Sequence, residues 1–200
     1  MDLSDDEILR RVQQGERTEF LELFDRYYPR IEGYAQRQLH NAEAARDIAS
    51  ETFLRAYRHV DSFRIGEISY VGYLFLVCRR LILTERQRAR SSPVVPWDPA
   101  QHENLAEAEP QADTAALPLA RVLHAEKRAV VRQALQQLPA DDQEIILLAF
   151  ERDLSRRDIA QILDKPSVSA VTSHLYRAMQ KLKVVLLQQG YFDATEAGWK

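Results

Sequence analysis

The chain has 200 residues, 46% of them hydrophobic, and a formal net charge of -3. This composition supports one or two packed domains and excludes a wholly disordered chain. The single cysteine, Cys78, excludes an internal disulfide framework. The acidic N-terminus lacks the apolar core of a secretory signal, and no run of about eighteen apolar residues is present. We therefore expect a soluble, cytoplasmic protein without membrane insertion.

Four helices are predicted in the first half of the chain. Ser4 and Glu7 form a capping box that opens the first helix, and Gly15 ends it. A second helix begins near Thr18, and Pro29 is expected to kink or interrupt it. Its apolar residues recur with the helical period, which predicts one buried face.

The third and fourth predicted helices run over residues 42–59 and 69–90, with a loop at 61–68 between them. The fourth is apolar in its first half and rich in arginine in its second half. With aromatic residues nearby, this pattern is typical of a surface that binds single-stranded nucleic acid. The alternative is that the aromatic rings form the core and the arginines a solvated face.

Proline and acidic residues mark a boundary in the middle of the chain. Five of the eight prolines lie between residues 93 and 118, and residues 93–122 hold five acidic side chains and one basic side chain. This composition predicts an extended linker between two domains. A passive tether is the simpler interpretation.

The last third of the chain follows the pattern of a helix-turn-helix. Helices are predicted at 126–137 and from Asp141 or Asp142 onward, and a capping box at Ser155–Asp158 opens a short helix that ends at Leu163. A turn and a long helix to about residue 188 follow. We expect these residues of the middle helix to be buried: Ile145, Ile146, Leu148, Ala149 and Phe150.

The long last helix is expected to place hydroxyl groups and cations outward, where they can contact base edges and phosphates. Ala160 is small enough for the two helices to cross closely, and Arg156 and Arg157 suit phosphate contacts. An ordinary helical hairpin is the alternative. The combination of capping, small residue and polar face favours DNA binding.

Whole strings in both halves match one family in order and spacing. The matching strings are residues 20–30, 45–57, 63–64, 134–139 and 154–163. On these strings the chain resembles the extracytoplasmic-function (ECF) group of bacterial RNA polymerase sigma factors. The resemblance covers residues 4–90 and 125–185.

The resemblance implies an all-α protein of two small helical domains joined by an acidic, proline-rich linker. Residues 1–91 would bind core RNA polymerase and melt the promoter, 92–122 would be the linker, 123–188 would read the -35 element, and 189–200 would be a tail. The partners would be core RNA polymerase, promoter DNA and an inhibitory anti-sigma factor. No catalysis, cofactor or metal is expected, and the acidic linker could mimic nucleic acid in a basic channel of the polymerase.

The resemblance also implies three sets of site residues. Core polymerase would contact Asp47, Glu51, Phe53, Leu54 and Tyr57. The -10 element would contact Phe63, Arg64, Tyr70, Tyr73, Arg79, Arg80, Arg86 and Arg88. The -35 element would contact Arg156, Arg157, Ser169, Thr172, Ser173, His174, Tyr176, Arg177 and Lys181.

Some positions depart from the family pattern. The fourth helix carries Tyr73 in place of Trp, Arg80 in place of Asn and Thr84 in place of Asp. The turn at 164–170 is one residue longer than usual, and Thr172 and His174 replace the usual Lys and Arg. We expect these changes to affect the -35 sequence that is read and not the fold.

Two other functions compete with that of a sigma factor. A stand-alone helix-turn-helix regulator would use the first domain as a sensor or dimerisation domain, but the match over residues 47–57 argues against it. An enzyme is disfavoured because the five histidines are scattered and neither a metal-ligand cluster nor a glycine-rich phosphate loop is present in the sequence.

Overall fold

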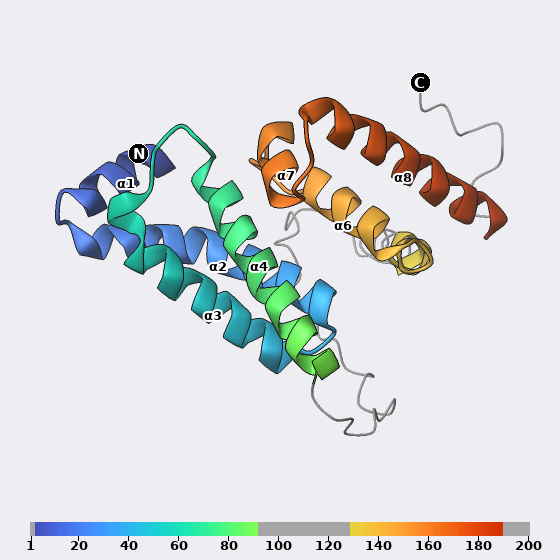
Figure 1. The fold of residues 1–200 in the computed structure, drawn as a ribbon, viewed down its shortest axis with the longest axis horizontal. Coiled ribbons are helices and arrows are strands. Elements are labelled where there is room, and N and C mark those ends of the chain that lie inside the picture. Colours follow the sequence, from blue (N-terminus) through green and yellow to red (C-terminus); the bar gives the residue numbers. More distant parts are fainter. Residues whose placement is uncertain (1–2, 92–128, 190–200) are drawn as a thin grey trace, which may run out of the picture. The chain divides into compact units, whose positions relative to one another are not determined.

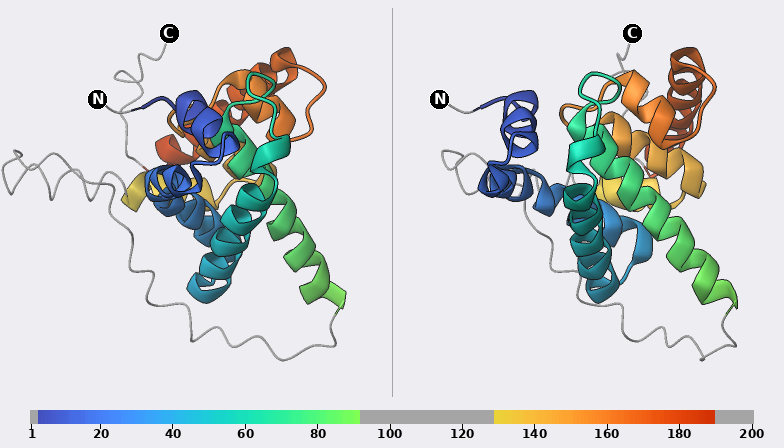
Figure 2. Two further views of the ribbon diagram at one scale, coloured as in Figure 1. Left: turned by 90° about the vertical axis from the view of Figure 1, so that its left-hand side faces the viewer. Right: turned by 60° about the vertical axis from the view of Figure 1, so that its left-hand side comes forward.

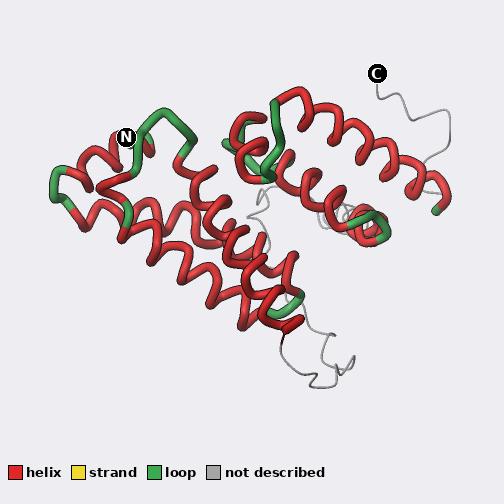
Figure 3. Tube along the Cα trace, in the orientation of Figure 1, coloured by secondary structure: helices red, strands yellow, loops and turns green. Residues whose placement is uncertain are grey.

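The computed structural model describes residues 3–91 and 129–189 (Figure 1). Over these residues every regular element is a helix (Figure 3), which confirms the all-α fold class. The chain divides into two compact units, Met1–Glu109 and Pro110–Lys200. The predicted linker and all but the first residue of the predicted tail lie outside the described residues.

The described residues of unit 1, 3–91, form four α-helices and two short 3-10 helices. They are α1 (Asp5–Gln13), η1 (Arg17–Glu19), α2 (Phe20–Leu39), α3 (Ala42–Arg58), η2 (Val60–Ser62) and α4 (Tyr70–Ser91). Helices α2, α3 and α4 pack against one another, and α1 packs on α2 (Figure 2). These bounds lie close to the predicted ones.

Of the two predicted outcomes at Pro29, a kink or an interruption, the interruption does not occur: helix α2 continues through Pro29. A proline inside a helix costs about 3 kcal/mol because it removes one hydrogen bond and crowds the preceding turn. Tyr27 and Ile31, on either side of it, are buried. Their burial offsets that cost, and the left-handed residue His40 ends the helix instead.

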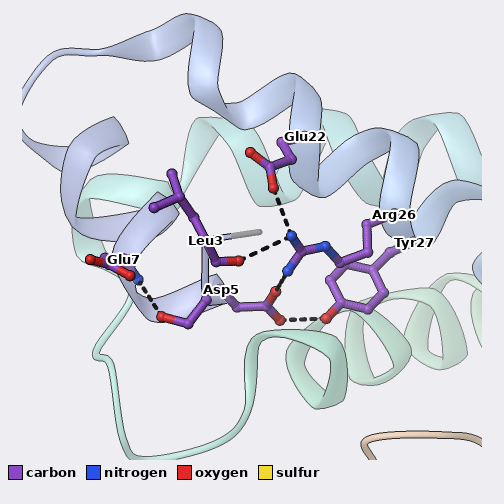
Figure 4. A network of polar contacts seen from close by, with 7 residues as sticks. Leu3, Asp5, Glu7, Glu22, Arg26 and Tyr27 are labelled. Carbon is purple, nitrogen blue, oxygen red and sulfur yellow. Dashed lines mark hydrogen bonds and ion pairs between the residues drawn. The ribbon is translucent and has the colours of Figure 1, made fainter. Parts of the chain in front are cut away.

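A polar network joins α1 to α2 (Figure 4). Arg26 donates hydrogen bonds to the Asp5 carboxylate, to Glu22 at 2.7 Å and to the carbonyl oxygen of Leu3 at 3.1 Å. The Tyr27 hydroxyl donates to the second oxygen of Asp5. Burial, together with this carboxylate, raises the pKa of Tyr27. Asp5 thus holds the first helix on the second through two donors at once.

Unit 2 contains the predicted helix-turn-helix. Residues 129–136 are helical, and α6 (Ala140–Ala149), α7 (Arg156–Ile162) and α8 (Val168–Gln188) follow. The capping box of α7 is confirmed: the Ser155 hydroxyl accepts from the Asp158 amide at 3.1 Å, and the Asp158 carboxylate accepts from the Ser155 amide at 3.0 Å. Helix α6 packs on both α7 and α8.

Phe150 differs from the prediction. It is 68% exposed, although its neighbours Ile146 and Leu148 are buried as expected. Helix α6 ends at Ala149, and the following turn passes through Asp153 in the left-handed region, with φ of 63°. Phe150 itself still has helical backbone, and its amide donates to the carbonyl oxygen of Ile146 at 3.2 Å. It therefore closes the last turn of α6, and its ring is exposed at that end of the helix.

A buried carboxylate ties α6 to α8. Asp142 is 4% exposed, and it accepts hydrogen bonds from Nε2 of His174 at 2.8 Å and from Nζ of Lys181 at 2.5 Å. Burial alone would raise the pKa of Asp142, but the hydrogen bonds from Lys181 and His174 hold it below 3.8. The ionised carboxylate is thus the state that the fold stabilises.

The network at Asp5 can be tested with a matched pair of variants. We expect Asp5→Ala to lower the free energy of unfolding by about 1–3 kcal/mol, because Arg26 and Tyr27 each lose a partner. Asp6→Ala removes an exposed acid from the same first turn and should change it by less than about 0.5 kcal/mol. Urea unfolding followed by circular dichroism measures both, and equal losses would contradict the assigned role of the network.

The Asp142 cluster predicts a pH-dependent stability. Asp142→Asn should cost about 1–3 kcal/mol at neutral pH, whereas Asp141→Asn, at the exposed neighbouring position, should cost little. Because the pKa of Asp142 is lowered on folding, its contribution is present above pH 3.8 and is lost as the pH falls through the lower value. The difference in unfolding free energy between wild type and Asp142→Asn should therefore shrink below pH 3.8. A constant difference down to strong acid would contradict this.

Candidate polymerase and nucleic-acid interfaces

The loop before α4 places an aromatic ring over two others. The ring of Phe63 lies 5.4 Å from that of Tyr70 and 5.2 Å from that of Tyr73, measured between centroids. Phe63 and Tyr73 are half-buried, so part of each ring is accessible. Tyr70 is only 2% exposed, and among the described residues its hydroxyl has no hydrogen-bond partner. Tyr70 is therefore a support beneath the surface, which corrects its prediction as a direct DNA contact.

This loop is held in place by two residues that the sequence did not reveal. The side-chain amide of Gln13 donates to the carbonyl oxygens of Val60 at 2.8 Å and Phe63 at 3.0 Å. Arg17 forms an ion pair with Asp61 at 2.7 Å. Both partners are more than forty residues away along the chain, so neither pairing has a local sequence signal.

The arginines of α4 are not equivalent. Arg80 is exposed and lies near Tyr73. Burial raises the pKa of the Tyr73 hydroxyl, and the charge of Arg80 offsets part of that rise. Arg79 is half-buried and Arg88 is exposed. Arg86 instead donates to the backbone carbonyl of Gln38, near the end of α2, and to its side-chain oxygen at 2.8 Å. These two bonds give Arg86 a partner within unit 1, and its role as a DNA contact stays a prediction.

Helix α3 presents large apolar residues to solvent. Leu54 is 43% exposed and Tyr57 39%. The two acidic residues predicted here also reach the surface: Asp47 is exposed, and Glu51 is half-buried and pairs with Arg55 at 2.6 Å. Large exposed apolar side chains that lie beside charged ones are typical of protein-binding surfaces.

Phe53, also predicted to contact the polymerase, is buried instead. Its ring centroid lies 4.9 Å from that of Phe24 and 5.9 Å from that of Tyr28, and the side chain is 2% exposed. It therefore packs α3 onto α2. Leu21, on α2, is strongly exposed, and sequence reasoning missed it because its neighbours Phe20 and Leu23 are core residues.

The predicted DNA surface of unit 2 is mostly accessible. The predicted residues that are exposed are Arg156, Arg157, Ser169, Thr172, Ser173, Tyr176, Arg177 and Lys181. Two predicted residues have a partner in Asp142: Lys181, whose Nζ donates to it at 2.5 Å, and His174, whose ring turns toward it and whose side chain is 15% exposed. The role of His174 as a base contact stays a prediction. Val168, at the start of α8, is exposed and was not among the predicted residues.

The described residues hold no group of three or more His, Cys, Asp or Glu side chains that could bind a metal ion. Over the same parts of the chain, no helix is both long enough and apolar enough to span a bilayer.

Comparison with known families gives two matches in chain order. The model of Sigma-70 region 2 matches residues 23–92, and that of Sigma-70, region 4 matches residues 128–182. Together they span more than half of the chain. The first covers the helices that carry the loop and the arginines, and the second covers the helix-turn-helix.

Curated relatives match along most of the chain. The RNA polymerase sigma-H factor of Pseudomonas aeruginosa is 29% identical over 186 residues, which is 91% of this chain and 93% of that protein. The ECF RNA polymerase sigma-E factor of Escherichia coli is 29% identical over 184 residues, covering 90% and 93%. The ECF RNA polymerase sigma factor SigW of Bacillus subtilis is 26% identical over 175 residues, covering 88% and 92%.

Solved structures share the fold. CnrH, in complex with the cytosolic domain of CnrY, has a TM-score of 0.59 and 20% identity, over 90% of this chain and 96% of that one. The sigma factor RpoE of Bartonella quintana, in complex with the anti-sigma factor NepR, has a TM-score of 0.59 and 23% identity, over 84% and 97%. From the two family matches and the relatives, the chain belongs to the ECF group of RNA polymerase sigma factors, which direct the polymerase to promoters, and it is not a stand-alone regulator.

Proposed function

We propose a division of labour among three surfaces of this sigma factor. Helix α3 and the adjoining face of α2 bind core RNA polymerase, the loop before α4 and α4 itself bind the -10 element, and α8 reads the -35 element. The observation that carries the proposal is the face formed by Phe63, Tyr73 and Arg80, where accessible rings and a cation lie together.

The chemistry of that face suits a base taken out of the DNA stack. A flipped base needs a ring to stack on and a cation near its phosphate, and stacking is worth about 1–3 kcal/mol per base. Phe63 and Tyr73 offer the rings, while Arg64 and Arg80 are exposed beside them in the loop and on the helix. Because Gln13 holds the loop in place, little conformational entropy is lost when the base binds.

The polymerase-binding surface rests on Leu54 and Tyr57, with Leu21 as an added candidate on α2. An exposed leucine is ordinary by itself, but three large apolar side chains on two packed helices form a candidate anchor. Asp47 and Glu51 would add charge at the rim of this surface, where it affects the association rate and the orientation of binding more than the affinity.

The -35 surface rests on the arrangement of a helix-turn-helix. In such motifs the second helix enters the major groove while the first lies across the backbone. Arg156 and Arg157, in the first turn of α7, would contact phosphates, and the exposed face of α8 would meet base edges.

We also propose an inhibitory partner and a cellular location for this sigma factor. The chain would carry out no chemistry of its own and would act in the cytoplasm, where RNA polymerase works. An anti-sigma factor would inhibit it by covering the polymerase-binding surfaces; a partner of this kind, NepR, is present in the solved complex of the Bartonella quintana RpoE. The acidic segment at 92–122 would either tether the units or occupy a basic channel of the polymerase.

The direct test is reconstitution. Purified chain and core RNA polymerase should together start transcription from a cognate promoter, and neither should do so alone. If the chain failed to bind core polymerase but bound a palindromic duplex by itself, the proposal would be overturned.

The polymerase-binding surface can be tested with matched leucines. Leu54→Ala should weaken binding to core polymerase about tenfold, because a buried anchor is lost at the interface. Leu83→Ala, at a position on α4 that is 44% exposed, makes the same chemical change outside this surface and should leave core binding unaltered. Fluorescence titration of labelled chain with core polymerase measures both. Equal losses would contradict the assignment.

A variant of the -10 surface should lose promoter opening and keep core binding. Arg80→Ala should slow promoter opening at least about tenfold, because a cation beside the base-binding rings is lost, and should leave core binding intact. Arg10→Ala removes an exposed arginine from α1 and controls for the loss of charge alone. Permanganate footprinting reports opening, and the titration above reports core binding. Loss of core binding in Arg80→Ala would refute the placement of this surface on α4.

A further inference from the structure

An apolar column runs along the exposed face of α8. Val168, Thr172 and Tyr176 are four residues apart, so they lie one above the other on the same side of the helix. Val168 is 45% exposed and Tyr176 66%. Thr172 is exposed as well, so none of the three is a core residue of unit 2.

Thr172 contributes its methyl group to this column. Its hydroxyl donates to the backbone carbonyl of Val168 at 3.0 Å. That bond uses the only hydroxyl proton, so Thr172 has no donor left for a base edge. The column therefore presents an isopropyl group, a methyl group and an aromatic ring to whatever binds α8.

The first two turns of α8 also lack the side chains that read guanine or adenine. Residues 168–175 include no Arg, Lys, Asn or Gln, and the ring of His174 is turned toward Asp142. Arginine and lysine are the usual partners of guanine, and asparagine and glutamine those of adenine. Ser169 and Ser173 flank the column, but a hydroxyl can contact several bases and discriminates little between them.

We propose that α8 recognises the -35 element through the 5-methyl groups of thymines, with Val168 and Thr172 as the reading residues. This inference rests on the proposed function, since it requires α8 to lie in the major groove. Thymine is the one base that carries a methyl group there, and small apolar side chains are its usual contacts. Cations remain available for phosphates, in Arg177 on α8 and in Arg156 and Arg157 on α7.

The spacing limits where the thymines lie. Val168 and Thr172 are about 6 Å apart along the helix axis, and base pairs are stacked about 3.4 Å apart. A helix lying along the groove would therefore place the two side chains about two base-pair steps apart, on thymines with one base pair between them. Tyr176, further along, would direct its hydroxyl to the sugar–phosphate backbone.

The test uses holoenzyme assembled from the full chain and core polymerase. Promoter DNA with a constant -10 element and a randomised -35 region is selected by binding, and we expect thymine to be enriched at one or more positions on either strand. Each enriched thymine is then replaced by deoxyuridine, which removes only the methyl group. Each replacement that lies under Val168 or Thr172 should weaken binding about fourfold.

Variants of the chain assign the contacts. Thr172→Ser keeps the hydroxyl and loses the methyl group, so holoenzyme carrying it should no longer distinguish thymine from deoxyuridine at one position. Val168→Ala should do the same at another position. Val184→Ala makes the same change at a second exposed valine of α8, in its distal half, and should keep the fourfold preference.

Three outcomes would overturn the inference. The selected -35 elements could be dominated by guanine with no thymine enriched, deoxyuridine could bind as well as thymine, or the preference for thymine could survive in both Thr172→Ser and Val168→Ala. A chain that does not bind core polymerase, or that gives no promoter-specific complex, would overturn the proposed function instead. The two failures are therefore distinguishable.

Discussion

The burial of the first half of α4 is the constraint on which the surfaces of unit 1 depend. Leu74 and Phe75 are fully buried and Tyr70 nearly so, while the helix continues for about another 20 Å beyond them. A helix anchored in this way carries Arg80 and Arg88 outward along a defined line. The same burial makes Tyr70 a fixed platform for Phe63. Core packing therefore positions the groups proposed to bind DNA.

Helix α3 reverses the usual distribution of side-chain sizes. Apart from Phe53, its inward face carries small residues, including the fully buried Ala45, Ala49 and Ala56, whereas Leu54 and Tyr57 are exposed. Small inward residues let α3 approach α2 and α4 closely, but they bury less apolar area than leucine would. The larger apolar groups on the outside are only partly used within the unit: the Tyr57 ring packs edge-on against Phe20 at 5.0 Å, but Tyr57 is still 39% exposed and Leu54 43%. Their placement is more readily explained by the burial that a bound partner would supply.

Local patterns explain why so much of the fold could be predicted. Helix periods, the capping residues Ser4 and Ser155, and the short-helix, turn and long-helix order are all properties of neighbouring residues. The contacts that local patterns do not reveal involve partners far apart in the chain. Arg86 binds Gln38, 48 residues away, and His174 binds Asp142, 32 residues away. Both side chains suit DNA when the sequence is considered alone, and only the packing of α2 on α4, or of α6 on α8, shows that each has a partner within its own unit. Phe53 and Tyr70 were misassigned for the same reason, because burial depends on which helices meet.

The weakness of each DNA surface explains why such a chain works through the polymerase. A good base contact discriminates by about 1–3 kcal/mol, whereas a specific site must exceed non-specific binding by about 4–10 kcal/mol. The proposed -10 face has two accessible rings, Phe63 and Tyr73, and the proposed reading residues of α8 carry methyl groups where bidentate side chains would give more. Neither surface can reach that range alone. Binding core polymerase converts the second DNA contact into an intramolecular step, so that two modest preferences act together. On this view the apolar surface of α3 is as necessary to promoter choice as the residues that contact DNA.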